Sequence, residues 1–142
     1  MISDNGVSRV WRDGNWIFKQ QPKFMTDNEI WCLETMLRYD RYVPSAEQVE
    51  IELIKMEYIE QTLITDFDVL RGHFEQILYT LGFAGIRHGD LTRPNILIRN
   101  NHPYLIDFSE SRLTYDPRVD KRPEGDKYWL WRTFDEITSN LQ

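Results

Sequence analysis

Three polar side chains, Asp90, Asn95 and Asp107, stand in one stretch of the sequence where their types and spacing suit a single reaction. Asn95 follows Asp90 by five positions, and Asp107 follows Asn95 by twelve. Asn95 and Asp107 offer the hard oxygen ligands that Mg²⁺ prefers, whereas Asp90 could accept the proton of an attacking hydroxyl. Phosphoryl transfer depends mainly on such positioning and charge neutralisation. The stretch therefore predicts a Mg²⁺-dependent transfer of phosphate to a hydroxyl group.

The residues around this trio predict a local structure that would bring it together. Short apolar runs at 96–98 and 104–106 are typical of strands, and the Asn-Asn-His-Pro sequence at 100–103 supplies turn chemistry between them. A hairpin folded at this turn would return Asp107 to the neighbourhood of Asn95. We therefore expect two metal-binding oxygens and one free carboxylate to converge.

The pattern His-x-Asp-x-x-x-x-Asn at 88–95, followed by a strand and Asp-Phe, resembles the catalytic loop and metal motif of the protein-kinase-like superfamily. The sequences HGDLT (88–92) and IDFS (106–109) are similar to those of its atypical branches, namely aminoglycoside phosphotransferases, RIO kinases and the small kinase of the tRNA threonylcarbamoylation complex. The resemblance implies a miniature two-lobed α+β kinase fold. A small antiparallel sheet lobe would span 1–58 and a truncated helical lobe 59–142, as one kinase-like domain, with the nucleotide in the cleft between them.

Lys19 ends an apolar run at 16–18 and is similar in place to the superfamily lysine that contacts the α and β phosphates of ATP. An Asp-Gly turn signal precedes this run, so a β-hairpin is predicted from 7–11 and 15–19. On its own, a lysine at a strand end is an ordinary surface residue. Its place ahead of the catalytic-loop motif favours the phosphate-binding role.

The resemblance also implies a glutamate that pairs with this lysine from a helix, which the sequence predicts over 27–38. Glu29 and Glu34 are the two candidates. Glu29 is preferred because a glutamate followed by leucines is closer to the family's helix. It also suits a purely structural capping box opened by Thr26.

Residues 49–56 alternate apolar and charged side chains, which predicts a half-buried strand. The sequence then continues as Met-Glu-Tyr-Ile at 56–59, which resembles a kinase hinge with Met56 as gatekeeper. The resemblance implies that backbone groups of Glu57 and Ile59 recognise adenine. A strand that simply leaves the sheet as a linker is the structural alternative.

Two more helices are predicted. One covers 66–81 and stops at Gly82, and the other begins at Asp126. The resemblance implies that the first supports the catalytic loop and that Asp126 braces this loop from below. A helix N-cap is the alternative role for Asp126. His88 is interpreted as a brace of the loop rather than an acid or base.

The chain departs from ordinary protein kinases at several places. Residues 4–8 hold one glycine instead of a glycine-rich motif, Gly89 stands where regulated kinases carry an arginine, and Ser109 replaces the glycine of Asp-Phe-Gly. Residues 110–125 are predicted to form a loop across the mouth of the site. These departures motivate the alternative of a pseudokinase-like binding or regulatory module. A small-molecule phosphotransferase is a further alternative.

Composition restricts the other function classes. The 142 residues suit one compact domain, and the net charge of −6 argues against broad binding to nucleic acids or anionic membranes. No apolar run approaches the length of a membrane span, and Cys32 is the single cysteine, so a soluble cytoplasmic protein is expected.

The sequence thus predicts an ATP- and Mg²⁺-dependent kinase that acts on serine or threonine hydroxyls of a protein. A protein substrate or partner is therefore expected. Aromatic residues in the last helix exceed what one helix face can bury, so some are expected to meet a second copy or a partner that completes the short helical lobe. These residues are Tyr128, Trp129, Trp131 and Phe134.

Overall fold

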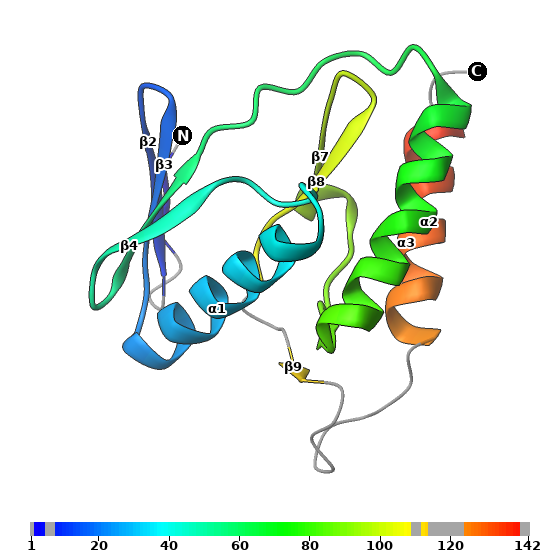
Figure 1. The fold of residues 1–142 in the computed structure, drawn as a ribbon. Helices are drawn as coiled ribbons and strands as arrows, with labels where there is room; N and C mark the ends of the chain where they lie inside the picture. Colours follow the sequence, from blue (N-terminus) through cyan, green and yellow to red (C-terminus); the bar gives the residue numbers. More distant parts are fainter. Residues whose placement is uncertain (1, 5–7, 109–111, 114–123, 140–142) are drawn as a thin grey trace.

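The computed structural model describes residues 2–4, 8–108, 112–113 and 124–139, and it divides the chain into a sheet-rich small lobe and a helical large lobe (Figure 1). The small lobe is an antiparallel sheet of five strands in the order β1-β2-β3-β5-β4, with helix α1 beside it. Its elements are β1 (Ile2–Asp4), β2 (Arg9–Asp13), β3 (Trp16–Gln20), α1 (Lys23–Tyr39), β4 (Ala46–Glu50) and β5 (Leu53–Glu57).

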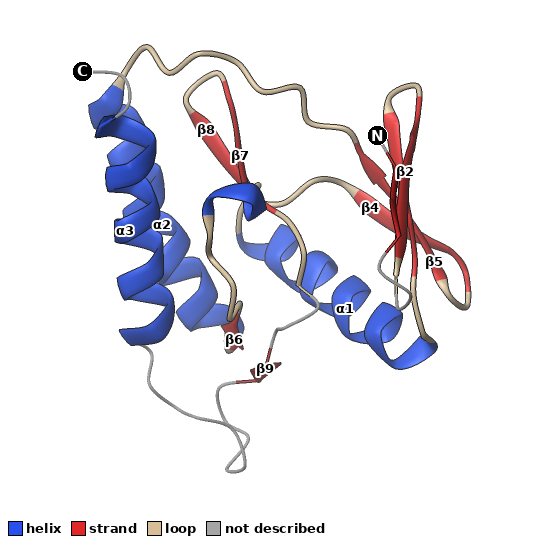
Figure 2. Ribbon diagram, turned by 180° about the vertical axis from the view of Figure 1, so that it is seen from behind, coloured by secondary structure: helices blue, strands red, loops and turns tan. Residues whose placement is uncertain are grey.

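The large lobe is built from two long helices and short strand pairs, among which the hairpin β7–β8 stands beside helix α2 (Figures 1 and 2). A long linker crosses from β5 to α2. The elements are α2 (Phe67–Ala84), β6 (Ile86–Arg87), the 3₁₀ turn η1 (Arg93–Asn95), β7 (Ile96–Arg99), β8 (His102–Leu105), β9 (Arg112–Leu113) and α3 (Glu124–Ser139). The predicted two-lobed α+β fold is confirmed.

The first predicted hairpin is present as β2 and β3. Gly14 occupies the turn with φ = 62°, a left-handed conformation that suits glycine, and Arg12 Nε donates to its carbonyl at 2.8 Å. Trp11 and Phe18 face each other across the pair with ring centroids 5.6 Å apart. This hairpin places Lys19 in the centre of the sheet, since β3 also pairs with β5.

The prediction of one half-buried strand over 49–56 is wrong. The chain reverses at 51–52, so this segment contributes to two antiparallel strands, β4 and β5. Val49 is 41% exposed and Ile51 64% exposed. Strand β4 lies at the sheet edge, and apart from Ala46, which packs against the core, its residues are exposed.

The helix ends also differ from the predictions. Helix α1 begins at Lys23, just after Pro22, so Thr26 lies inside the helix and donates to the carbonyl of Gln21 rather than opening a capping box. Helix α2 continues through Gly82 and ends at Gly85, which has φ = 69°. A glycine ends this helix as predicted, but one turn later.

Helix α1 joins the two lobes through two faces. Ile30 packs with Ile54 and Met56 of the sheet, whereas Cys32, Leu33 and Met36 belong to the large core around α2 and α3. A helix held on both sides can carry polar groups to the boundary between the lobes. None of the helices in the described ranges is long and apolar enough to cross a bilayer.

The aromatic residues of α3 divide into two groups. Tyr128 and Trp129 are exposed, whereas Phe134 is buried and Trp131 packs beside it. The expectation that some of them meet a partner stays a prediction. The reduced phosphate loop around 5–7, Ser109 and most of the predicted 110–125 loop lie outside the described residues.

Candidate active site

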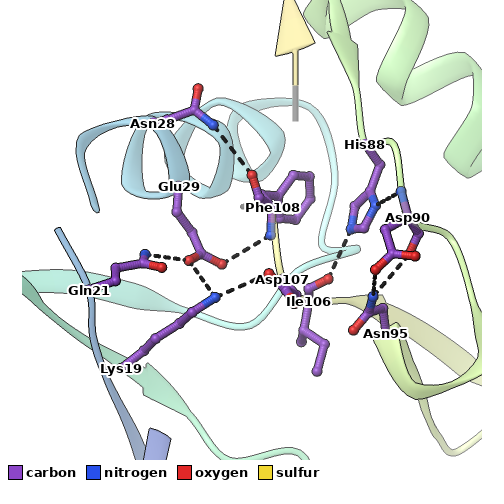
Figure 3. A network of polar contacts seen from close by, with 10 residues as sticks. All are labelled: Lys19, Gln21, Asn28, Glu29, His88, Asp90, Asn95, Ile106, Asp107 and Phe108. Carbon is purple, nitrogen blue, oxygen red and sulfur yellow. Dashed lines mark hydrogen bonds and ion pairs between the residues drawn. The ribbon is translucent and has the colours of Figure 1, made fainter. Parts of the chain in front are cut away.

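Lys19, Glu29 and Asp107 form one charged network where the lobes meet (Figure 3). Lys19 Nζ lies 2.9 Å from Glu29 Oε1 and 3.1 Å from Asp107 Oδ1. Burial acts to lower the pKa of Lys19, but the two carboxylates outweigh it and raise this pKa above the usual 10.5. The ammonium group therefore stays charged and in a fixed position.

Glu29 also ties helix α1 to the segment that carries Asp107. Glu29 is fully buried, and its Oε2 accepts from the backbone N–H of Phe108 at 3.0 Å. Asn28 Nδ2 donates to the carbonyl of Phe108 at 3.3 Å, so adjacent residues of α1 hold both backbone groups of Phe108. Gln21 completes the contacts of Glu29 with a 2.8 Å bond to Oε1. Of the two candidate glutamates, Glu29 pairs with Lys19, and Glu34 is exposed.

The side chain of Asp107 is partly exposed at the boundary between the lobes, where it meets Lys19. Its backbone has φ = 61°, a left-handed conformation that aspartate tolerates better than most residues. Its side chain is 39% exposed, whereas that of Lys19 is 9% exposed. The N–H of Ile106 donates to the carbonyl of Asn95 at 3.0 Å, so the β7–β8 hairpin returns the chain beside Asn95. The hairpin predicted from the sequence is present.

The side chain of Asn95 holds that of Asp90. Asn95 Nδ2 donates to both the backbone carbonyl and Oδ2 of Asp90, each at 2.9 Å, and Thr92 Oγ1 lies 3.4 Å from Asp90 Oδ1. These contacts hold the carboxylate of Asp90 in one orientation. Because the amide nitrogen of Asn95 is used on Asp90, its Oδ1 is the atom that can face a cation.

His88 connects the catalytic loop to the strand end before Asp107. Its Nε2 lies 2.9 Å from the carbonyl of Ile106, so this nitrogen must carry the proton, and Nδ1 accepts from the N–H of Asp90 at 3.1 Å. The ring is fully buried and packs on Phe108 at a centroid distance of 4.6 Å. This geometry agrees with the bracing role inferred from the sequence.

His88 is expected to stay neutral under mildly acidic conditions. Burial lowers its pKa below the usual 6.5, so the unfolded chain takes up a proton on this ring before the folded protein does. His88 should therefore destabilise the fold as the pH falls below 6.5. An NMR titration of the imidazole signals, assigned with His88→Gln, should give a midpoint under 6.5 for His88. A midpoint at or above this value would contradict the buried neutral ring.

Helix α3 holds the catalytic loop from below, as the resemblance implied for Asp126. The carboxylate of Asp126 accepts from the N–H of His88 at 2.8 Å and from that of Gly89 at 3.0 Å. Gly89 has φ = 89°, which disfavours any residue with a Cβ and explains why no arginine stands here. Thr133 Oγ1 adds a 2.8 Å bond to the carbonyl of Leu91.

The predicted hinge lies at the end of β5. Met56 is buried and pairs with Ile17 of β3. The N–H of Glu57 donates to the carbonyl of Ser45 at 2.8 Å, so only the carbonyl of Glu57 could serve an adenine edge there. Ile59 is buried at the start of the linker. The suggested adenine contacts of Glu57 and Ile59 stay a prediction.

The donor set fits Mg²⁺ bound together with phosphates rather than a dedicated metal cage. Among the described residues, no three histidine, cysteine, aspartate or glutamate side chains converge on one point. Asn95 and Asp107 offer two hard oxygen ligands, and Mg²⁺ commonly takes one or two protein ligands and completes its shell with water and phosphate oxygens.

Sequence reasoning missed three supporting side chains, namely Gln21, Asn28 and Thr133. Asn28 directly precedes Glu29 in the sequence, and this position could have marked it as a candidate site residue. Gln21 and Thr133 contact groups distant in sequence, Glu29 and Leu91. Their roles depend on the tertiary arrangement, which no local pattern carries.

Comparison with known families gives a match across most of the chain. The family model described as the RIO domain matches residues 11–139. A stretch of 58 residues is 41% identical to a probable bifunctional tRNA threonylcarbamoyladenosine biosynthesis protein of Methanocorpusculum labreanum, covering 40% of this chain and 10% of that relative.

Solved structures of the Rio2 kinase from Chaetomium thermophilum are similar in fold. One, described as an ADP/Mg²⁺-phosphoaspartate complex, has a TM-score of 0.76 at 16% identity and covers 98% of this chain and 55% of that one. The other has a TM-score of 0.77 at 16% identity and covers 96% and 56%. The chain thus spans little more than half of each Rio2 kinase chain and a tenth of the archaeal relative.

Proposed function

The chain belongs to the RIO domain family, and on that premise we propose that it is an atypical kinase that transfers the γ-phosphate of ATP to a serine or threonine hydroxyl of a protein. The observation that carries the proposal is the assembled polar network. Lys19 is paired with Glu29 and Asp107 at the lobe boundary, and Asp90, which is oriented by Asn95, lies next to His88 (Figure 3). A kinase site requires the lysine–glutamate pair with its metal-binding aspartate and the catalytic-loop residues to be in place at the same time.

Each residue then has a task that its geometry supports. The charged Lys19 steadies the nucleotide phosphates, and Glu29 keeps that lysine in position from α1. Asn95 Oδ1 and the carboxylate of Asp107 would hold Mg²⁺, which would neutralise charge on the transferred phosphoryl group. Asp90 accepts the proton of the attacking hydroxyl, since Asn95 and Thr92 already aim its carboxylate.

Two findings support ATP and Mg²⁺ as the cofactors. The Rio2 kinase structure similar in fold is described as an ADP/Mg²⁺ complex. The protein oxygens available here are those that suit Mg²⁺. We place the nucleotide between a small lobe at 1–58 and a large lobe at 59–142, with the backbone of Glu57 and Ile59 at the adenine.

Thermal unfolding with nucleotide tests the proposal without an acceptor. ATP with Mg²⁺ should stabilise the wild-type protein, by about 2.7 kcal/mol at a hundredfold excess over Kd. Asp107→Asn should keep part of the stabilisation by ATP but depend less on Mg²⁺, because one of the two oxygen ligands is weakened.

Asp68→Asn is the matched control, because Asp68 is an exposed carboxylate of α2 that pairs with Arg71 at 3.0 Å. It should respond to ATP and Mg²⁺ as the wild type does. A wild-type unfolding temperature unchanged by saturating ATP with Mg²⁺ would contradict the proposed function.

A further inference from the structure

A hollow of about 430 Å³ opens beside the catalytic loop, on the large lobe. The linker after β5 forms one wall, η1 forms another, and β7 and α3 contribute apolar side chains. The residues that matter here are Thr62, Leu63, Arg93, Pro94, Ile98 and Ile137.

The linker wall is fixed by hydrogen bonds to β7. The N–H of Thr62 donates to the carbonyl of Ile98 at 3.0 Å, and the N–H of Ile98 lies 3.3 Å from Gln61 Oε1. Thr62 Oγ1 also accepts from the N–H of Asn100 at 2.7 Å. Leu63, the next residue, is 81% exposed. A large apolar side chain is thus held at the surface by a rigid segment, which is an arrangement suited to binding another apolar group.

Arg93 supplies a positive charge at the rim of this hollow. It is exposed, and none of the ion pairs or hydrogen bonds among the described side chains involves it. Arg93 opens the η1 turn that ends at Asn95, the residue that orients Asp90. The same short turn therefore fixes the backbone of Arg93 relative to the proposed base.

We propose that this hollow docks the acceptor polypeptide, with an apolar side chain against Leu63 and Ile137 and one acidic side chain against Arg93. The inference rests on the proposed function, because it places the acceptor hydroxyl at Asp90. Arg93 lies three residues after Asp90, a span of at most about 10 Å, which an extended peptide covers in about three residues. The acidic residue should therefore lie about three positions from the phosphorylated serine or threonine.

The charge of the whole chain limits how acidic this acceptor is. The net charge of −6 repels a strongly acidic protein at long range, whereas one acidic residue in contact with Arg93 is attracted locally. An otherwise neutral or basic segment with one acidic and one apolar residue beside its hydroxyl fits both conditions.

Binding of short synthetic peptides tests this inference without ATP. Fluorescently labelled serine peptides with one leucine, differing only by Asp, Ala or Lys about three residues from the serine, are titrated with the full chain and followed by anisotropy. The wild type should prefer the Asp peptide over the Lys peptide by about fivefold, the size expected of an exposed ion pair. Arg93→Glu should reverse that order, and Leu63→Ser should weaken all three peptides.

Arg41→Glu makes the same charge change at another exposed arginine and should leave the order unchanged. Equal binding of the three peptides by the wild type, an unreversed order in Arg93→Glu, or no measurable binding of any peptide would overturn the inference. A charge preference without phosphate transfer would leave docking intact and contradict the kinase proposal. Phosphate transfer without a charge preference would support the kinase proposal and contradict the docking inference.

Discussion

Replacing Asp90 by asparagine is expected to abolish phosphate transfer while leaving nucleotide binding intact. Loss of a general base typically reduces a rate by about 10²–10⁴-fold. The asparagine oxygen can still accept the 2.9 Å bond from Asn95 Nδ2, so the loop should keep its shape. The proton of the attacking hydroxyl, however, would no longer have a carboxylate to receive it.

Turnover of labelled ATP and calorimetric binding of an ATP analogue measure the two parts of this prediction separately. Asp68→Asn again serves as the control, because it makes the same chemical change on the exposed face of α2. If Asp90→Asn and Asp68→Asn turn over ATP at the same rate, Asp90 is not the base.

Replacing Lys19 by methionine is expected to damage both stability and phosphate binding. Glu29 is fully buried, and without Lys19 its charge would keep only the hydrogen bonds from Gln21 and Phe108. Removing one partner of a buried ion pair typically costs about 3–5 kcal/mol. Urea unfolding measures this loss, and the affinity for ATP should fall with it because the cation that meets the phosphates is gone.

Lys23→Met is the matched control at a surface pair. Lys23 lies 2.6 Å from Asp27 with a side chain 67% exposed, and such pairs contribute about 1 kcal/mol or less. The double variant Lys19→Met with Glu29→Gln separates the two effects, because removing both charges should restore stability but not ATP affinity. Equal losses of stability in Lys19→Met and Lys23→Met would show that the buried pair has no special role.

Local sequence patterns predicted the parts of the site that depend on short-range structure. The turn at 100–103 folds β7 and β8 together, and this brings the end of β8 to Asn95. The hydrogen bond from the N–H of His88 to Asp126 also agrees with the bracing role that the resemblance implied. The hairpin follows from turn chemistry, whereas the role of Asp126 was implied by the family resemblance.

The rest of the site depends on how the lobes pack, which local patterns do not carry. The alternation at 49–56 suggested one strand, but the chain reverses at 51–52 and contributes to two paired strands, β4 and β5. The capping motif at Thr26 was outweighed by a helix start after Pro22, which frees Glu29 to reach Lys19 and Phe108. The hollow beside Arg93 combines a linker, a turn and the end of α3, so only the folded chain reveals it.

Transfer of the labelled γ-phosphate of ATP by the wild-type protein tests the central claim most directly. The protein is incubated with ATP and Mg²⁺, with the chain itself and a serine peptide as acceptors. The account predicts label on a hydroxyl of one of these acceptors, and its loss when Mg²⁺ is chelated. Binding of ATP with Mg²⁺ but no transfer to either acceptor would contradict it and would indicate a pseudokinase-like binding module instead.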